Sequence, residues 1–263
     1  MSRESWSGAA AYEAFIGRYS RRVAPVHLDQ LGVPPGRRWL DVGCGTGALS
    51  STILERARPS ALTGVDPSTA FLEAARVSIS DPRATFLQGS ALALPVADGS
   101  ADAAVAGLVL NFVGDVPAAL AEVRRALAPG GVVGAYVWDY AEGMELLRRF
   151  FDAAIAVHAR DAADADEGAR FPLCRPGPLG GAFTRAGFRD VVVEPIDVTG
   201  SYADFDALWS PFLGGVGAAP TYLAGLDAET QARIREHLRS TVPIRPDGSI
   251  LVTARAWSVR GIS

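Results

Sequence analysis

The stretch Leu40-Asp41-Val42-Gly43-Cys44-Gly45-Thr46-Gly47 decides the fold. It joins a short apolar run, typical of a buried strand, to a segment with apolar residues at helical spacing. Glycines at such a junction allow a tight turn and let a ligand lie against bare backbone. Asp66 follows about 20 residues later, after the next strand-like run, where a carboxylate can accept the hydroxyl hydrogens of a ribose. The stretch therefore predicts an adenine nucleoside site at the carboxyl edge of a sheet.

Strand-like and helical segments alternate around this stretch. Strands are expected at Arg38–Val42, Ala61–Val65, Ala84–Gln88, Ala103–Leu110 and Val132–Trp138. Asp115 opens an amphipathic helix between the last two of these strands. The alternation requires crossover connections and predicts a parallel sheet with helices on both faces.

The rhythm changes after Trp138. Helices are expected at Gly143–Arg160, Pro178–Ala186, Tyr202–Phe212 and Asp227–Ser240, with strands at Arg189–Val198 and Ile250–Val259. The Ala/Asp-rich stretch Asp161–Gly168 is expected to be a mobile loop. Paired arginines are expected on solvated helix faces, at Arg21-Arg22, Arg124-Arg125 and Arg148-Arg149.

The composition fits one globular unit. Of 263 residues 49% are hydrophobic and 21% charged, and a net charge of −4 disfavours a nucleic acid partner. Two cysteines, Cys44 and Cys174, are too few for a disulfide framework and favour a reducing, cytoplasmic location. The N-terminus lacks the apolar core of a signal peptide. The longest apolar run, Ala103–Val113, is too short to span a bilayer, so no membrane partner is expected.

The glycine stretch by itself leaves the ligand open, because Gly43–Ala48 also satisfies the loose dinucleotide pattern G-x-G-x-x-G/A. Asp41 favours a different ligand. A carboxylate beside a pyrophosphate would repel it, whereas the ammonium of a methionine moiety would be attracted. The alternative is that Asp41 caps backbone amides of the loop. A nicotinamide-dependent oxidoreductase would also need a Tyr/Lys pair or an acid–base histidine near the sheet edge, and the sequence presents none.

Four segments, in order, resemble the motifs of class I S-adenosylmethionine (SAM)-dependent methyltransferases. They are Leu40–Gly47, Val65–Ser68, Gln88–Pro95 and Leu127–Gly131. The set is similar to the ubiquinone/menaquinone-biosynthesis type of small-molecule methyltransferase. The resemblance implies a Rossmann-like α/β fold with a seven-stranded, mostly parallel sheet, in which Ile250–Val259 is the antiparallel last strand beside the fifth. We expect one domain over 1–263, with a lid helix in 1–36, a SAM-binding core in 37–138, and cap segments that bind the acceptor in 139–188 and 199–248.

The resemblance also implies roles by position. The methionine part would lie against Asp41, Gly43, Cys44, Gly45 and Gly47, the ribose against Asp66, Pro67 and Ser68, the adenine against Gly89, Ser90 and Ala91, and the sulfonium above Gly107 and Leu108. Family members usually carry an acidic residue at the position of Ser90, whose uncharged hydroxyl weakens the contact by about 1 kcal/mol.

The lid helix is expected to bring Tyr12, Arg18 and Tyr19 over the cofactor, with Arg18 paired to the methionine carboxylate. The alternative is a helix packed on the sheet with Arg18 in solvent.

Methyl transfer to a small-molecule acceptor is an in-line displacement at a carbon activated by the sulfonium, so the protein mainly supplies alignment and a water-poor pocket. Neither a metal nor a catalytic triad is expected. Asp139 would be the base for a hydroxyl or amine acceptor; the alternative is a turn residue before Glu142. Acceptor contacts are expected from residues after strand four and in the cap, each of which could equally be a core residue: Asn111, Trp138, Tyr140, Phe171, Trp209 and Phe212. A non-catalytic SAM-binding protein and an NAD(P)-dependent oxidoreductase are the alternative functions.

Overall fold

The computed structural model describes residues 17–214 and 217–263 and divides the chain into two compact units. We call the first the sheet unit; it comprises Val23–Val137, Leu173–Ile196 and Ala256–Ser263. We call the second the helical unit; it comprises Met1–Arg22, Trp138–Pro172 and Asp197–Arg255. The chain crosses between the units within α2, β5, β6 and β7 and between α8 and α9.

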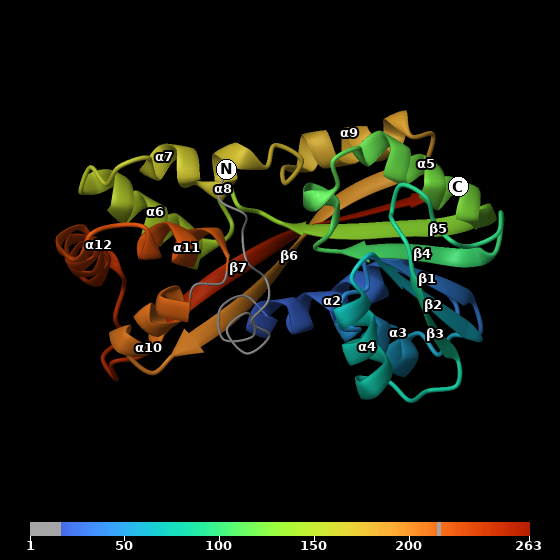
Figure 1. The fold of residues 1–263 in the computed structure, drawn as a ribbon, viewed down its shortest axis with the longest axis horizontal. Coiled ribbons are helices and arrows are strands. Elements are labelled where there is room, and N and C mark those ends of the chain that lie inside the picture. Colours follow the sequence, from blue (N-terminus) through green and yellow to red (C-terminus); the bar gives the residue numbers. More distant parts are fainter. Residues whose placement is uncertain (1–16, 215–216) are drawn as a thin grey trace. The chain divides into compact units, whose positions relative to one another are not determined.

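Seven strands form one sheet in the order β3-β2-β1-β4-β5-β7-β6 (Figure 1). Their bounds are β1 Arg38–Val42, β2 Ala61–Asp66, β3 Ala84–Gln88, β4 Ala101–Gly107, β5 Leu127–Trp138, β6 Arg189–Tyr202 and β7 Ile250–Ile262. Strands β1 to β5 are paired in parallel. β7 runs antiparallel to β5: in the sheet unit Ser263 N donates to Gly131 O, and in the helical unit Asp139 N donates to Arg255 O, each at 2.9 Å. The predicted seven-stranded sheet with an antiparallel last strand beside the fifth is confirmed.

The register of the central strands brings polar residues to one edge. Val42 is paired with Val65 on β2, and Asp41 with Val105 on β4. Four of the five β1 residues are buried, because helices cover both faces of a parallel sheet. Asp41 and Asp66 therefore lie near the carboxyl ends of adjacent strands, where open α/β sheets bind ligands.

The helices of the sheet unit include two that begin at a side-chain cap. Their bounds are α2 Arg18–Leu31, which continues from the helical unit, α3 Ala48–Arg56, α4 Thr69–Ser78, α5 Val116–Ala126 and α9 Pro176–Arg185. Ser68 Oγ accepts from Phe71 N at 3.3 Å, and Asp115 Oδ1 accepts from Ala118 N at 3.0 Å. Each cap satisfies an amide that the first helical turn leaves without a partner.

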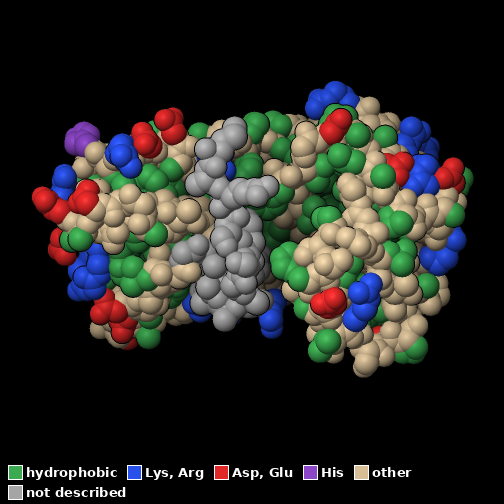
Figure 2. All heavy atoms as spheres, viewed as in Figure 1, with side chains coloured by type: hydrophobic (Ala, Val, Ile, Leu, Met, Phe, Trp, Pro, Cys, Tyr) green, Lys and Arg blue, Asp and Glu red, His purple; other side chains and the backbone are tan. Residues whose placement is uncertain are grey.

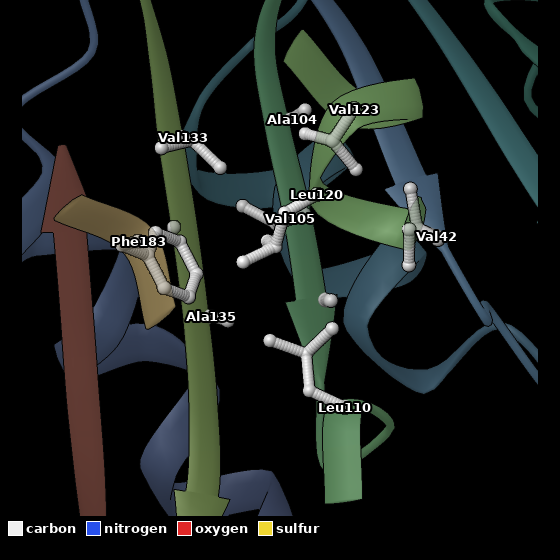
Figure 3. A pocket seen from close by; sticks show the side chains of 12 residues that line it. Val42, Ala104, Val105, Leu110, Leu120, Val123, Val133, Ala135 and Phe183 are labelled. Carbon is white, nitrogen blue, oxygen red and sulfur yellow. The ribbon is translucent and has the colours of Figure 1, made fainter. Parts of the chain in front are cut away.

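The helices α3 and α4 lie on one side of the sheet, with α5 and α9 on the other (Figure 1). Under α5 and α9, Leu120, Val123 and Phe183 point toward Val105 and Val133 (Figure 3). Only apolar side chains and backbone line the small cavity between them. It belongs to the hydrophobic core and offers no polar group to a ligand.

The helical unit has its own aromatic core. Its helices are α6 Glu145–Ala156, α7 Ala162–Ala165, α8 Glu167–Arg170, α10 Phe205–Trp209, the 3-10 turn η3 Ser210–Gly214, α11 Ala218–Ala224 and α12 Ala228–Thr241. The ring of Phe150 stacks on that of Phe212, with centroids 4.7 Å apart, and Trp209 lies 5.6 Å from Phe212. Stacked rings of this kind hold short helices that would be marginal alone.

Three expectations about the helical unit are wrong. Asp161–Gly168 is not a loop throughout, because α7 and α8 form there. Asp166 caps α8 through Gly168 N at 2.8 Å and is paired with both terminal nitrogens of Arg148. Arg148 is consequently not on a solvated face. The sequence analysis did not predict α11. The residues expected to form one helix at Tyr202–Phe212 instead form the end of β6, then α10 and η3.

Two strand boundaries also differ from expectation. β4 ends at Gly107, because Leu108 takes a left-handed conformation with φ of 59° and a 3-10 turn, η2 Leu110–Phe112, follows. β5 begins at Leu127, before the Pro129-Gly130-Gly131 segment expected to precede it, and the β4–β5 register shifts between Ala101 and Ala103. A bulge of this type accommodates turn residues inside a strand.

Acidic and basic side chains lie next to one another on the face drawn in Figure 2. Ion pairs within the sheet unit join Arg38 to Asp102 at 2.7 Å and Arg56 to Asp29 at 2.8 Å. Among the described residues, no helix combines the length and apolar character needed to cross a bilayer.

Candidate functional site

The glycine loop between β1 and α3 is tied to the end of β2. Gly43 N and Cys44 N both donate to Val65 O, at 2.7 and 3.1 Å. Gly43 has a φ of 72°, and a Cβ there would lie 2.6 Å from Val109 Cγ2. Both the backbone conformation and the close approach of the segment after β4 therefore require glycine. The result is a short loop at the carboxyl end of β1, in which Gly43 and Gly45 are half-buried.

Asp66 at the end of β2 organises this loop. One carboxylate oxygen accepts from Gly45 N at 3.0 Å and the other from Ser68 N at 2.9 Å. The side chain thus joins the glycine loop to the start of α4, although the residue is only 7% exposed. Each carboxylate oxygen has a further lone pair, which can accept a hydroxyl hydrogen from a ribose.

Asp41 on β1 has a different environment. It is 0% exposed, and its Oδ2 accepts from Ser50 Oγ at 2.6 Å. Its Oδ1 is buried and has no hydrogen-bond partner. Burial raises the pKa of Asp41 to about 7; the Ser50 hydrogen bond lowers this pKa and the Asp66 carboxylate raises it. An unpartnered buried carboxylate oxygen is costly and is a place for a cationic hydrogen-bond donor.

The capping alternative for Asp41 is not what the structure shows. Its hydrogen-bond partner is Ser50 on α3, not an amide of the glycine loop. Within the part of the chain that the structure describes, no arginine or histidine forms an ion pair with Asp41. The environment of Asp41 therefore fits the ammonium of a methionine moiety.

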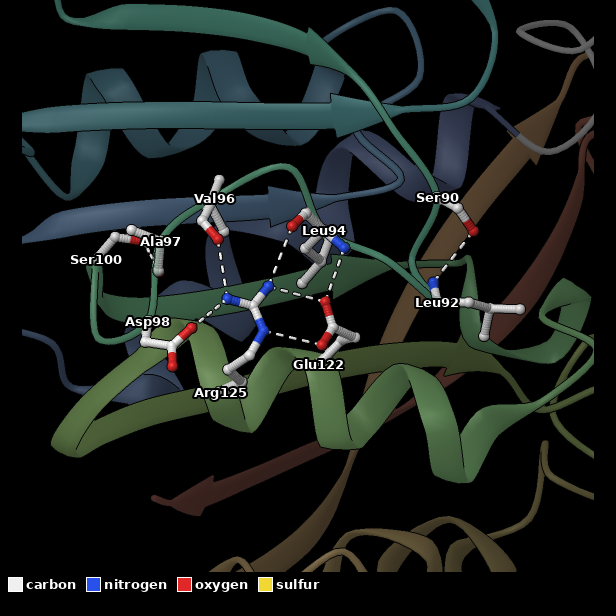
Figure 4. Close-up of polar contacts among 9 residues, drawn as sticks. All are labelled: Ser90, Leu92, Leu94, Val96, Ala97, Asp98, Ser100, Glu122 and Arg125. Carbon is white, nitrogen blue, oxygen red and sulfur yellow. Dashed lines mark hydrogen bonds and ion pairs between the residues drawn. The ribbon is translucent and has the colours of Figure 1, made fainter.

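The segment after β3 lies beside Asp66. Gly89 N donates to Asp66 O at 3.1 Å, and Ser90 Oγ accepts from Leu92 N at 3.1 Å in a tight turn (Figure 4). The segment is anchored on α5 by Arg125, which donates to Leu94 O and Val96 O and pairs with Glu122 and Asp98 (Figure 4).

Arg125 was expected on a solvated face, and that expectation is wrong. Its hydrogen bonds hold the pKa of Glu122 at about 2, so the network stays charged at neutral pH. The i,i+3 spacing of Glu122 and Arg125 was the available sequence signal.

The floor of the site at the end of β4 includes a residue that sequence reasoning missed. A Cβ on Gly107 would lie 2.6 Å from the hydroxyl oxygen of Tyr136 on β5. Leu108 N donates to Tyr136 O at 2.8 Å. The lack of a side chain at Gly107 therefore admits the Tyr136 hydroxyl to the end of β4. Nearby in the chain, Asn111 Nδ2 is buried without a hydrogen-bond partner.

Comparisons with known proteins agree with this geometry. Residues 40–134, which contain the glycine loop and the ends of β1 to β4, match the family model described as "Methyltransferase domain". This part of the chain belongs to the class I SAM-dependent methyltransferase family.

Individual relatives show how much of the chain is similar to known methyltransferases. The chain is 36% identical to an uncharacterized methyltransferase of Mycobacterium tuberculosis, over 53% of each chain. It is 31% identical to the malonyl-[acyl-carrier protein] O-methyltransferase of Xylella fastidiosa, over 69% of this chain and 58% of the relative. It thus spans about half the length of these relatives. The Haemonchus contortus phosphoethanolamine N-methyltransferase 2 has the same fold, with a TM-score of 0.61, 18% identity, and coverage of 98% of this chain and 57% of that one.

The structure brings most of the predicted cofactor residues to one region of the sheet unit. These lie at or just after the ends of β1 to β4: Asp41, Gly43, Cys44, Gly45, Gly47, Asp66, Pro67, Ser68, Gly89, Ser90, Ala91, Gly107 and Leu108. Asn111 lies in η2, just after β4. Which part of the cofactor each residue contacts stays a prediction.

Two of the predicted lid residues, Arg18 and Tyr19, belong to the helical unit. Arg18 donates to Ser201 O at 3.1 Å and lies over the Tyr202 ring, 4.6 Å from its centroid. Tyr19 is 2% exposed, and its hydroxyl is hydrogen-bonded to that of Tyr202 at 3.0 Å. Both side chains are thus packed against the end of β6, and Arg18 is not simply in solvent. Tyr12 lies outside the described residues, and closure over the cofactor stays a prediction.

The aromatic residues predicted to contact the acceptor are packed in the helical unit. Trp138, Tyr140, Trp209 and Phe212 are buried, and the Phe171 ring lies 5.5 Å from that of Tyr140. These contacts are those of core residues, the alternative that the sequence left open. Their contact with an acceptor stays a prediction.

Asp139 is used in the turn before α6. Its Oδ1 accepts from Glu142 N at 3.1 Å, and its carbonyl oxygen accepts from Gly143 N at 3.0 Å. The residue is 3% exposed. The turn role that the sequence left open is therefore present, and the role as a base stays a prediction.

Proposed function

We propose that this methyltransferase transfers a methyl group from SAM to a small-molecule acceptor. The observation that carries the proposal is the unpartnered, buried Asp41 Oδ1 beside the glycine loop. Together with Asp66 it places two carboxylates around the loop. When both are ionised, as in the complex, these carboxylates favour a ligand with cationic groups and disfavour a pyrophosphate.

The residues at the strand ends fit the three parts of the cofactor. Asp66 would accept the ribose hydroxyls, the glycine loop and Asp41 would hold the methionine part, and Gly89 to Ala91 would lie along the adenine. When bound, SAM supplies a methyl group on a sulfonium, which leaves as a neutral thioether. Asp41 and Asp66 need no movement of the loop to serve these roles, because the loop is already tied to Val65 and Asp66.

The contribution of the chain to the reaction would be alignment. Holding two reactants in the geometry of an in-line displacement supplies a large part of the barrier reduction. The buried Tyr136 ring lies against Gly107 at the end of β4 and would exclude water from that side. The buried Asn111 amide, which has no hydrogen-bond partner, would donate to a polar atom of the acceptor.

The acceptor class is proposed from two named relatives. One is the malonyl-[acyl-carrier protein] O-methyltransferase noted above. The other is a 2-phytyl-1,4-naphtoquinone methyltransferase of Thermosynechococcus vestitus, 40% identical over 40% of this chain and 47% of the relative. A first acceptor panel should therefore contain acyl thioesters with a free carboxylate and substituted naphthoquinones.

Calorimetry with SAM, S-adenosylhomocysteine (SAH) and NAD tests the ligand. We expect both sulfur nucleosides to bind and NAD to give no heat. Tighter binding of NAD would replace the proposal with an oxidoreductase. An acceptor screen scored by SAH release then tests transfer. SAH release with none of a broad panel, despite tight SAM binding, would favour the non-catalytic alternative.

Asp139→Asn tests the proposed base. Asparagine keeps an oxygen that can accept from Glu142 N, so the turn is retained while the proton acceptor is lost. If Asp139 is the base for a hydroxyl or amine acceptor, kcat should fall about 100-fold with an unchanged affinity for SAH. An unchanged kcat would leave Asp139 as a turn residue.

A further inference from the structure

Asp41 is the buried carboxylate on which the proposed function depends, and Ser50 is the hydrogen-bond partner that opposes the effect of burial on its pKa. We propose that Ser50 is a positioning residue that helps Asp41 carry a negative charge, and that binding of the cationic cofactor expels a proton from Asp41 to the solvent. The inference rests on the proposed function and concerns the same site.

The contact between the two residues is short and enclosed. Ser50 and Asp41 are both 0% exposed, and Ser50 Oγ donates to Asp41 Oδ2 at 2.6 Å. Ser50 lies on the buried face of α3 with three apolar residues, Leu49, Ile53 and Leu54. A hydroxyl on such a face needs a partner, and Asp41 is that partner.

The hydrogen bond also selects which oxygen is available. With Oδ2 held by Ser50, Oδ1 is the oxygen without a partner. Rotation of the carboxylate is restrained, so Oδ1 keeps one direction. Ser50 therefore presents a single acceptor atom to an incoming ammonium without contacting that ligand itself.

Burial, helped by the charge of Asp66, keeps a proton on Asp41 below about pH 7 in the ligand-free protein. On β2, Asp66 raises the pKa of Asp41, and in the glycine loop Cys44 is a neutral thiol whose pKa is raised by burial. On β4 the paired residue is Val105, and α3 presents Ser50 among apolar residues. Burial is the largest cause, and the pKa of Asp41 is about 7. The Ser50 hydrogen bond is the main opposing influence.

The proton balance is simple. The O–H bond of the Asp41 carboxylic acid breaks, its electron pair stays on the carboxylate, and the proton goes to the buffer. The carboxylate then accepts a hydrogen bond from the ammonium of the ligand. SAH keeps that ammonium although it lacks the sulfonium charge, whereas 5′-methylthioadenosine has neither.

The unmodified protein gives the first test. SAH is titrated calorimetrically at about pH 6 and about pH 8.5, each in two buffers with different ionisation enthalpies. We expect release of close to one proton at the lower pH and close to none at the higher, with affinity about tenfold weaker at the lower pH. 5′-Methylthioadenosine should show neither effect. SAH binding without proton release at the lower pH would overturn the inference.

Ser50→Ala tests the positioning role. Loss of the hydrogen bond should move the midpoint of the pH dependence of SAH affinity upward by about one pH unit. Ser50→Thr keeps a hydroxyl and should restore the midpoint. Ser51→Ala is the matched control, because Ser51 lies on the same helix and its hydroxyl faces Glu55.

The possible failures are distinguishable. A Ser50→Ala variant that binds SAH with the unmodified midpoint would overturn the role of Ser50. Because proton release is measured on the unmodified protein, an unstable variant does not remove the test of proton expulsion. A protein that binds neither SAM nor SAH at any pH would instead reject the proposed function.

Discussion

The ends of β1 and β2 carry two carboxylates that look alike in the sequence and differ in the structure. Asp66 accepts from two backbone amides, of Gly45 and Ser68. Asp41 accepts from one serine hydroxyl, and its second oxygen is buried without a partner. Asp66 therefore holds the loop in place and can also accept hydrogen bonds from a ligand. Asp41, in contrast, has one carboxylate oxygen that is free to accept a hydrogen bond from a cationic ligand. The same residue type on adjacent strands thus serves a structural and a charge-selective purpose.

The largest expected effect is that of Asp66→Ala. The change removes the acceptor for both loop amides and for the ribose hydroxyls. Each hydrogen bond to a charged group contributes about 1.5–3 kcal/mol, so we expect SAH affinity to fall about 100-fold in calorimetry. Asp29→Ala removes an exposed carboxylate paired with Arg56 and should leave the affinity within about twofold. If the SAH affinity of Asp66→Ala stays within about threefold of the original, the end of β2 is not part of the cofactor site.

Asp41→Asn should have a pH-dependent effect on stability. The pKa of Asp41 is about 7 in the folded protein, against an ordinary value of 3.8. As pH rises from about 4 to about 7, the unfolded chain loses its proton first, so the folded state loses stability in this window. The variant has no such loss. Without ligand it should therefore be more stable than the original at about pH 8, by roughly 2 kcal/mol in denaturant unfolding, and not at about pH 4. A stability difference that does not change with pH would contradict the buried, protonated state of Asp41.

His27 is a useful contrast to Asp41, because burial lowers the pKa of His27 and raises that of Asp41. The stability contributed by the two groups therefore depends on pH in opposite directions. It is fully buried, its Nδ1 is hydrogen-bonded to Ser258 Oγ at 2.8 Å, and burial lowers its pKa to about 3 from 6.5. As pH falls below about 6.5, the unfolded chain gains a proton that the folded protein does not, so stability is lost. We expect His27→Asn to remove about 2 kcal/mol of the loss between about pH 7.5 and 5. His158→Asn, at an exposed position, should leave the slope unchanged.

Ser90→Asp should have the smallest effect. The turn after β3 would keep its acceptor for Leu92 N, and the added charge would strengthen a contact with the adenine amino group. We expect SAM affinity to rise about fivefold, or about 1 kcal/mol. Ser60→Asp, an exposed position just before β2, adds the same charge away from the strand ends and should give no gain. Equal gains in both variants would indicate a general charge effect in place of an adenine contact.

Much of the site was predictable because it follows one continuous strand–loop–helix segment and the ends of parallel strands. The loop, Asp41 and Asp66 were found in this way. Ser50 was missed although a signal existed, since it is the polar residue on the apolar face of α3. Tyr136 gave no signal, because its approach to Gly107 depends on the register between β4 and β5.

The helical unit was less predictable for a physical reason. Its helices are short, and their apolar residues are satisfied by rings far apart in the sequence, such as Phe150 and Phe212. In the sequence, Asp166 is typical of a polar loop, whereas in the structure it forms an ion pair with Arg148. An aromatic residue in such a segment fits a core and a ligand pocket equally well.

The alternation of strands and helices in the sheet unit, the glycine loop and the two carboxylates beside it follow from the sequence alone, because these depend on local periodicity and on glycine conformations. The tertiary structure alone decided the state of those carboxylates. Whether Asp41 is charged depends on burial, on the Ser50 hydroxyl and on the distance to Asp66, and none of these three is set by neighbours in the chain.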